Sequence, residues 1–271
     1  MTAGSDLLVC DLDGTLVDKS LKLDPALVEA FHRAAERGLL IALATGRMPA
    51  GAERYRDELR ISAPSIYYNG ALVRDHDGGR DLVALSLPRG LLRRTYEIFA
   101  NAPVHPLFYR DDKLFCLEQT FPIRDYGDIQ GLTVEPIPDP DQFLALGAFV
   151  KSLFIGHPQM LPLLRAELEA AAGSEARLVM TRADYLEMIP AGASKGAALD
   201  ALAEHLGVPL GRVVAVGDQE NDLEMIERAG VGVAMPGAPA GVRDAADRVA
   251  PAPDDGGLLA LFREILPQYF A

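Results

Sequence analysis

Short apolar runs alternate with helical patterns near the start of this chain, and this alternation constrains the fold more than any other feature. Three buried runs begin at Leu7, Leu39 and Ser65. Helical patterns that begin near Asp24-Pro25 and Pro49 separate them. Strands joined by helices at this spacing form parallel sheets with right-handed crossovers. We therefore expect the first 70 residues to start a parallel sheet.

The middle of the chain has a different pattern. Turn-forming sequences at Arg74–Asp81 and Tyr109–Leu114 lie between alternating runs, and Arg177–Pro190 has the pattern of a strand pair. These features are typical of antiparallel hairpins. The parallel pattern returns with a helix expected over Ser194–Leu206 and a buried strand over Arg212–Asp218.

These two patterns predict an α/β protein with a split domain. We expect a Rossmann-like parallel-sheet core formed by residues 1–79 and 189–271. An inserted α+β cap domain is expected over residues 80–188.

The composition limits the class of protein. Hydrophobic residues make up 49% of the 271 residues, which is enough for a sizeable core. The net charge of -13 disfavours nucleic acid as a partner, because an acidic surface repels phosphate backbones. No apolar run reaches the roughly 18 residues of a membrane span, and the first residues do not have the pattern of a signal peptide. With only two cysteines, Cys10 and Cys116, a disulfide framework is not expected, and we predict a cytoplasmic protein.

Polar residues follow three of the expected parallel strands. Asp11 and Asp13 follow the first, Thr45-Gly46-Arg47 follows the second, and Asp218 with Asp222 follows the strand after residue 212. Ligands of open α/β sheets bind outside the carboxyl ends of the strands, so these groups converge if the strands are neighbours. Several carboxylates in one crevice repel one another unless a cation lies among them. Oxygen ligands without His or Cys favour Mg²⁺.

A magnesium site with a hydroxyl and a lysine suits phosphate chemistry. Mg²⁺ and Lys195 can neutralise phosphoryl oxygens, and the Thr45 hydroxyl can donate a hydrogen bond to one of them. One carboxylate of the pair Asp11 and Asp13 can attack phosphorus, and the other can transfer a proton. The residue types alone do not assign these two roles.

Four motifs in this order resemble the haloacid dehalogenase (HAD) superfamily of phosphatases and phosphomutases. They are DLDGTL (Asp11–Leu16), ATGR (Ala44–Arg47), SKG (Ser194–Gly196) and GDQEND (Gly217–Asp222). Further segments resemble the Cof-type phosphatases, which have a large C2-type cap between the second and third motifs. These segments are YYNGA (Tyr67–Ala71), EMIPAGASKGAAL (Glu187–Leu199) and NDLEMIERAGVGVAM (Asn221–Met235). The chain departs from the family at Pro236–Gly241, where a Gly-Asn-Ala-like turn is usual.

The resemblance implies roles for the catalytic residues. Asp11 would be the nucleophile that forms an aspartyl-phosphate, and Asp13 would be the general acid and base. Thr45 and Lys195 would complete the catalytic set by binding the phosphoryl group. The phosphate- or substrate-binding residues would be Thr45, Gly46, Arg47, Lys195 and Asn221.

The resemblance also implies a metal site for Mg²⁺. Its ligands would be Asp11, Asp13 through the backbone carbonyl, Asp218 and Asp222, the last directly or through water. The expected activity is Mg²⁺-dependent hydrolysis of a small phosphorylated metabolite, such as a sugar phosphate. A phosphomutase with the same aspartyl nucleophile is one alternative, and a non-catalytic protein that binds phosphorylated metabolites is another. No heptad pattern or long apolar stripe indicates an oligomeric state.

Each singled-out residue also has an ordinary structural interpretation. Asp11 and Asp13 could belong to a plain turn, and Thr45 could be a helix N-cap. Lys195 could be solvated in a first helical turn, and Asp222 could only cap the following helix. Glu187 could face a cleft or lie on a strand surface.

Overall fold

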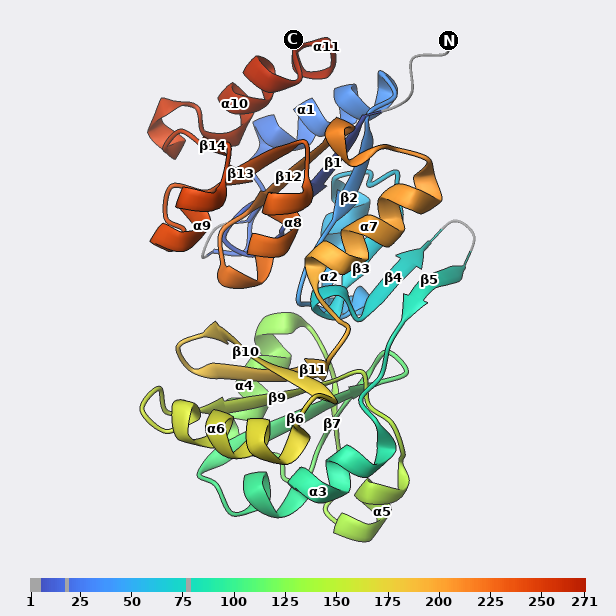
Figure 1. Ribbon diagram of the computed structural model, residues 1–271, viewed down its shortest axis with the longest axis vertical. Coiled ribbons are helices and arrows are strands. Elements are labelled where there is room, and N and C mark those ends of the chain that lie inside the picture. Colours follow the sequence, from blue (N-terminus) through green and yellow to red (C-terminus); the bar gives the residue numbers. More distant parts are fainter. Residues whose placement is uncertain (1–5, 18–19, 77–78) are drawn as a thin grey trace. The chain divides into compact units, whose positions relative to one another are not determined.

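The computed structural model of this 271-residue chain describes residues 6–17, 20–76 and 79–271. The chain forms two compact units (Figure 1). Unit 1 comprises Met1–Gly46, Ala52–Val83 and Ser194–Ala271. Unit 2 comprises Arg47–Gly51 and Ala84–Ala193.

Unit 1 is built on a parallel sheet of five strands. In spatial order these are β14 (Arg248–Val249), β13 (Val231–Ala234), β12 (Val213–Gly217), β1 (Leu7–Cys10) and β2 (Leu40–Leu43). All neighbouring pairs are parallel, and β1 lies between β12 and β2. The prediction of an α/β fold with a parallel sheet is therefore confirmed.

Helices cover both faces of this sheet (Figure 1). They are α1 (Pro25–Glu36), α2 (Pro49–Glu58, which begins in unit 2), α7 (Lys195–Leu206), α8 (Leu223–Arg228), α9 (Ala240–Ala245), α10 (Gly257–Ile265) and α11 (Pro267–Phe270). Leu7 and Val9 pack with buried residues of α7, while Phe31 of α1 contacts the rings of Phe262 and Phe270. The start of α1 is as predicted, because the Asp24 carboxylate accepts a hydrogen bond of 2.8 Å from the Ala26 amide.

A second sheet in unit 1 has the order β3-β4-β5. Its strands are β3 (Ser65–Tyr67), β4 (Leu72–Asp75) and β5 (Arg80–Ala84), the last of which enters unit 2 at Ala84. The predicted turn at 74–81 includes residues 77–78, which lie outside the described residues. The sequence SIYYNG (Ser65–Gly70) predicts that the third strand continues to Gly70, and this prediction is wrong. That strand ends at Tyr67, because the next three residues form the left-handed turn η1 (Tyr68–Gly70).

Unit 2 contains a six-stranded sheet in which only β7 and β8 pair in parallel. Its strands in spatial order are β10 (Ala176–Arg182), β11 (Tyr185–Pro190), β9 (Lys151–Gly156), β6 (Val104–Arg110), β7 (Lys113–Cys116) and β8 (Val134–Pro136). The predicted hairpin between β6 and β7 is confirmed, and its tip residues Asp111 and Asp112 have φ of 51° and 55°. Such values match the two-residue turn that suits a twisted hairpin.

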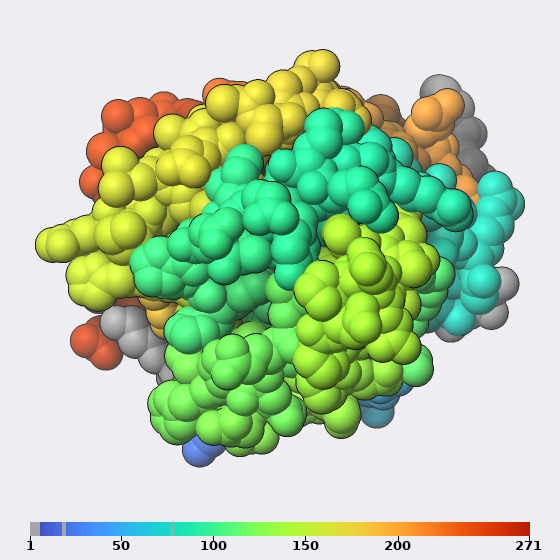
Figure 2. Space-filling model, turned by 90° about the horizontal axis from the view of Figure 1, so that it is seen from below, coloured from blue at the N-terminus to red at the C-terminus, as the bar shows by residue number. Residues whose placement is uncertain are grey.

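One face of the unit 2 sheet packs against helices. The helices of unit 2 are α3 (Arg89–Ala100), α4 (Phe121–Gln130), α5 (Pro140–Ala145) and α6 (Leu161–Ala172). Residues of α3, α5 and α6 share one buried cluster with Phe108 and Phe154 of the sheet. Figure 2 looks onto this helical layer, with α3 in green-cyan and α6 in yellow. No helix among the described residues is long and apolar enough to cross a membrane.

Candidate active site

The candidate site begins at the carboxyl ends of β1 and β12. Asp11 directly follows β1, and Asp218 directly follows β12. The two strands are parallel neighbours with Cys10 opposite Val216, and the Asp11 amide donates a 2.8 Å hydrogen bond to the Val216 carbonyl. The two aspartates therefore lie at the same edge of the sheet, as the sequence predicts.

Three carboxylates and one lysine form a buried cluster at this edge. One oxygen each from Asp11, Asp218 and Asp222 lies within 4.8 Å of the others. The Lys195 ammonium donates to Asp11 Oδ1 at 2.6 Å and to Asp222 Oδ1 at 2.5 Å. Only 1% of Lys195 is exposed, so the interpretation of a solvated lysine is wrong.

The charge of the cluster is not balanced by Lys195 alone. With three ionised carboxylates and one ammonium group, two negative charges remain uncompensated. Burial raises the pKa of Asp11 well above its usual value; Lys195 opposes this rise, and the charges of Asp222 and Asp218 add to it. Burial alone would lower the pKa of Lys195, but Asp11 and Asp222 raise it above its usual value, so the ammonium stays charged.

The cluster fits a divalent metal ion. All three acidic groups offer oxygen, which suits Mg²⁺. A divalent cation would also match the two uncompensated charges. Asp11, Asp218 and Asp222 could therefore hold the ion.

Asp222 has a structural role in addition to its contact with Lys195. Its Oδ2 atom accepts hydrogen bonds from the amides of Asp218 at 2.9 Å and Gln219 at 3.0 Å. Its Oδ1 atom accepts the bond from Lys195. A side chain at Gly217 would collide with Asp222, so this glycine leaves room for the carboxylate. Asp222 therefore caps the turn that follows β12 and also belongs to the acidic cluster.

Two partners of Asp218 were not identified in the sequence. The Thr15 hydroxyl donates to Asp218 Oδ1 at 3.1 Å. The side-chain amide of Gln219 donates to Asp218 Oδ2 at 2.9 Å. Both residues lie inside motifs noted above, but only the fold shows that their side chains converge on Asp218. Gly14, with φ of 90°, passes so close to Asp218 that a Cβ atom there would collide with its carboxylate. Together these contacts fix the orientation of the carboxylate.

Asp13 and Thr45, two other predicted site residues, lie in the segments that follow β1 and β2. The Asp13 side chain is exposed and is not one of the three clustered carboxylates. Thr45 is buried, and its backbone amide donates to the Ile66 carbonyl at 2.9 Å. An N-cap residue directly precedes the first residue of its helix, but α2 begins at Pro49, so Thr45 is not its N-cap.

Asn221 and Arg47, two further predicted residues, each donate a side-chain hydrogen bond within their own unit. The Asn221 amide donates to Asn69 Oδ1 at 2.9 Å, within unit 1. Arg47 belongs to unit 2, and its guanidinium donates to the Gly51 carbonyl at 3.0 Å. The structure therefore brings Asp11, Lys195, Asp218 and Asp222 into one cluster and links Asn221 to the segment after β3.

Glu187 in unit 2 is not a surface residue. Only 5% of it is exposed, and its carboxylate accepts a 2.8 Å hydrogen bond from Lys151 on the neighbouring strand β9. The interpretation of a surface strand position is therefore wrong. Lys151 also lies over the ring of Tyr109, 4.6 Å from its centroid.

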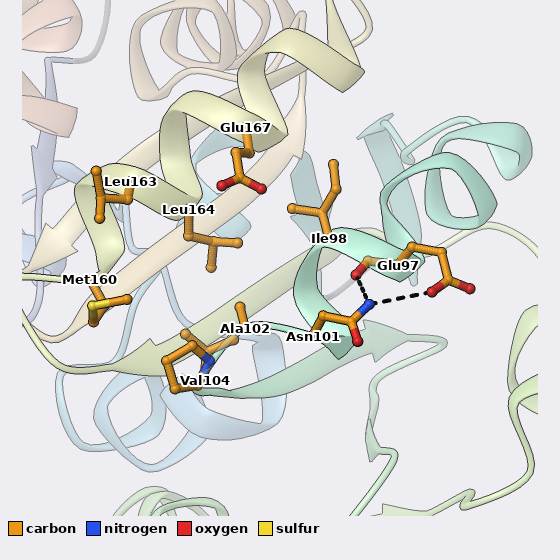
Figure 3. Close-up of a pocket in the computed structure, with 10 residues that line it drawn as sticks. Glu97, Ile98, Asn101, Ala102, Val104, Met160, Leu163, Leu164 and Glu167 are labelled. Atoms are coloured by element: carbon orange, nitrogen blue, oxygen red, sulfur yellow. Dashed lines mark hydrogen bonds between the residues drawn. The ribbon is translucent and has the colours of Figure 1, made fainter.

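A pocket of about 290 Å³ lies in unit 2 between α3 and α6 (Figure 3). Met160, Leu163 and Leu164 give it an apolar wall, and Glu97 and Glu167 add carboxylates. None of its lining residues belongs to the acidic cluster.

The effect of Asp218→Asn on Mg²⁺ binding tests the metal site. Wild type should be stabilised as Mg²⁺ is added, by about 2.7 kcal/mol at a concentration 100 times the Kd. The Asn variant should need at least about tenfold more Mg²⁺ for the same rise in Tm, because one charged ligand is lost. Asp255→Asn, an exposed carboxylate, is the matched control. Equal Mg²⁺ dependence in the wild type and the Asp218 variant would argue against the site.

Comparison with known proteins identifies the family. The profile of the haloacid dehalogenase-like hydrolases matches residues 8–262. The chain is 34% identical over 239 residues to an HMP-PP phosphatase from Yersinia enterocolitica, covering 84% of this chain and 83% of that protein. It is 29% identical over 273 residues to the chloroplastic endoribonuclease YBEY of Arabidopsis thaliana; 94% of this chain is covered, but it spans only 46% of that relative's length. Among solved structures, a haloacid dehalogenase-like hydrolase from Bacteroides thetaiotaomicron has a TM-score of 0.87 at 26% identity, over 96% of this chain and 99% of that one. As its motifs predict, the chain belongs to the haloacid dehalogenase (HAD) superfamily, and it is a Cof-type phosphatase.

Proposed function

We propose that this phosphatase hydrolyses small phosphorylated metabolites with Mg²⁺, through an aspartyl-phosphate on Asp11. The observation that carries the proposal is the buried contact of the Lys195 ammonium with Asp11 inside the three-carboxylate cluster. A fixed cation beside a carboxylate favours binding of a phosphoryl group next to that carboxylate.

In the first step the Asp11 carboxylate attacks phosphorus. A bond forms between a carboxylate oxygen and phosphorus, and the bond from phosphorus to the ester oxygen breaks. Asp13 donates its proton to that oxygen, so the product leaves as a neutral alcohol.

In the second step water attacks the phosphorus of the aspartyl-phosphate. Asp13, now a carboxylate, accepts a proton from this water, and the bond between phosphorus and the Asp11 oxygen breaks. Inorganic phosphate leaves, and both aspartates return to their starting state. Water is consumed, and the metabolite loses its phosphate.

The other predicted residues bind and orient the phosphoryl group. Lys195 neutralises its charge, and the Thr45 hydroxyl donates a hydrogen bond to it. Asp11, Asp218 and Asp222, with the backbone carbonyl of Asp13, would hold Mg²⁺. When bound, this ion withdraws electron density from phosphoryl oxygens and lowers the repulsion between phosphate and carboxylates. The remaining phosphate-binding residues are Gly46, Arg47 and Asn221.

The substrate class is proposed as small metabolites, with sugar phosphates as the first group to test. We propose a catalytic core of residues 1–79 and 189–271 and a cap of residues 80–188. A cap of this size favours small substrates over proteins. The relative named as an HMP-PP phosphatase adds HMP-PP to the substrates worth testing.

The test is phosphate release from about a hundred phosphorylated metabolites, including sugar phosphates and HMP-PP. Each is assayed with Mg²⁺ and with a chelator. We expect release of inorganic phosphate that depends on Mg²⁺ and occurs only with small substrates. Isomerised product without free phosphate would instead establish a phosphomutase. Binding of metabolites without any turnover would establish a non-catalytic protein.

A further inference from the structure

The turn η1 after β3 is an unusual segment of unit 1. Its three residues, Tyr68, Asn69 and Gly70, have φ of 51°, 55° and 96°. Tyr68 and Asn69 are each only 1% exposed. The turn lies between β3 and β4 (Figure 1).

Three left-handed residues in a row are costly for the fold. Glycine adopts this conformation freely and asparagine tolerates it, but for tyrosine it is strained. Such strain persists only where surrounding contacts hold it, and it is concentrated at functional sites. The contacts of the turn therefore indicate what the strain achieves.

Asn69 contacts two segments that carry predicted phosphate-binding residues. Its backbone amide donates to the Thr45 carbonyl at 3.1 Å. Its side-chain Oδ1 accepts the 2.9 Å hydrogen bond from Asn221. A Cβ atom placed on Gly46 would lie 3.0 Å from the same Oδ1 atom, so the carboxamide lies directly against Gly46.

Gly70 connects the turn to a third segment. A side chain at this position would collide with the backbone carbonyl of Ser194, the residue before Lys195. The turn is thus in close contact with the segments of Thr45, Asn221 and Lys195.

We propose that Asn69 is a positioning residue of this phosphatase, which fixes the Asn221 side chain and the Thr45–Gly46 segment for phosphate binding. The inference rests on the proposed function. Asn69 acts through Asn221 and needs no contact with the substrate. Asparagine suits the position because it combines tolerance of the left-handed backbone with a carboxamide acceptor.

The experiment compares Asn69→Gly and Asn69→Ala, each in the wild-type and the Asn221→Ala background. Glycine removes the carboxamide and keeps the left-handed backbone, whereas alanine removes the carboxamide and adds strain. The readouts are kcat/KM with the best substrate of the metabolite panel, binding of inorganic phosphate with Mg²⁺, and Tm.

Both substitutions should lower kcat/KM by roughly 10- to 100-fold in the wild-type background, as for other residues that orient a ligand-binding group. In the Asn221→Ala background the further loss should be less than about threefold, because the group that Asn69 positions is gone. The Tm of Asn69→Ala should lie roughly 2–4 °C below that of Asn69→Gly. Phosphate binding should weaken in parallel with kcat/KM.

Two results would overturn the inference. One is a wild-type kcat/KM for Asn69→Gly. The other is a loss that is equal in both backgrounds, which a purely structural role would give. Failure of the wild-type protein to bind phosphate or to turn over any substrate would instead overturn the proposed function. If no activity can be measured, Tm still tests the contact. Additive changes in Tm for Asn69→Gly and Asn221→Ala would exclude coupling between Asn69 and Asn221.

Discussion

Asp11→Asn should abolish phosphate release, with kcat reduced by at least about 10³-fold. The carboxamide keeps the size of the side chain but is a very poor nucleophile, so no aspartyl-phosphate can form. Substrate binding should be retained or improved, because the change removes a negative charge that repels phosphate. The measurement is initial-rate phosphate release at saturating Mg²⁺, together with binding of the same substrate.

The fold of this variant should remain intact. Asp11 lies in a cluster with two uncompensated negative charges, so removing one carboxylate relieves repulsion even though Lys195 loses an ionic partner. We expect a metal-free Tm equal to or above that of the wild type. Asp254→Asn, an exposed change of the same kind, should leave both rate and Tm unchanged. A folded Asp11→Asn protein that releases phosphate within tenfold of the wild-type rate would contradict the assignment.

Lys195→Met should lower both stability and activity. The lysine is the cation that contacts two buried carboxylates, and breaking such a contact from one side costs roughly 3–5 kcal/mol. This loss should be seen in urea unfolding without metal, and added Mg²⁺ should restore part of it because the ion supplies the missing positive charge. At saturating Mg²⁺, kcat/KM should remain at least about 10²-fold below the wild type, since the phosphoryl group has lost its fixed ammonium.

Two further variants sharpen this test. Lys22→Met removes an exposed lysine and should change the free energy of unfolding by less than about 0.5 kcal/mol. Lys195→Arg keeps the charge but adds bulk in a buried position, so it should be more stable than Lys195→Met in the absence of metal. A metal-free stability of Lys195→Met equal to that of Lys22→Met would show that the buried contact contributes nothing.

Local patterns were sufficient to predict the parallel sheet and the residues at its edge. Strand and helix periods identified β1, β2 and β12, and the residues after them are fixed to the same edge by parallel pairing. The sequence predicts that Asp11 and Asp218 meet if their strands are neighbours, and the pairing of β1 with β12 shows that they are. Lys195 was assigned to the phosphate site from its charge and from its motif, but its contacts with Asp11 and Asp222 could not be predicted, because they join segments far apart in the chain.

Features that depend on tertiary contacts could not be predicted. The sequence SIYYNG reads as a strand throughout, yet Tyr68–Gly70 turns back in a left-handed conformation that is held by Thr45, Asn221 and Ser194. Glu187 reads as an ordinary polar strand residue. Its burial depends on Lys151, which is 36 residues earlier and comes next to it only when β9 and β11 pair.

The aspartyl-phosphate on Asp11 can be detected as a covalent intermediate of the reaction. Asp13→Asn keeps the nucleophile but removes the group that protonates the leaving oxygen and later activates water. With p-nitrophenyl phosphate, whose leaving group needs no proton, only the second step is slowed, so the intermediate should accumulate. The protein is mixed with this substrate and Mg²⁺, quenched in acid within milliseconds, digested and analysed by mass spectrometry. We expect one added phosphoryl group on the peptide that contains Asp11, and none when Asp11→Asn is added to the same protein. Phosphate release with no phosphorylated peptide, or with the phosphoryl group on another residue, would contradict it.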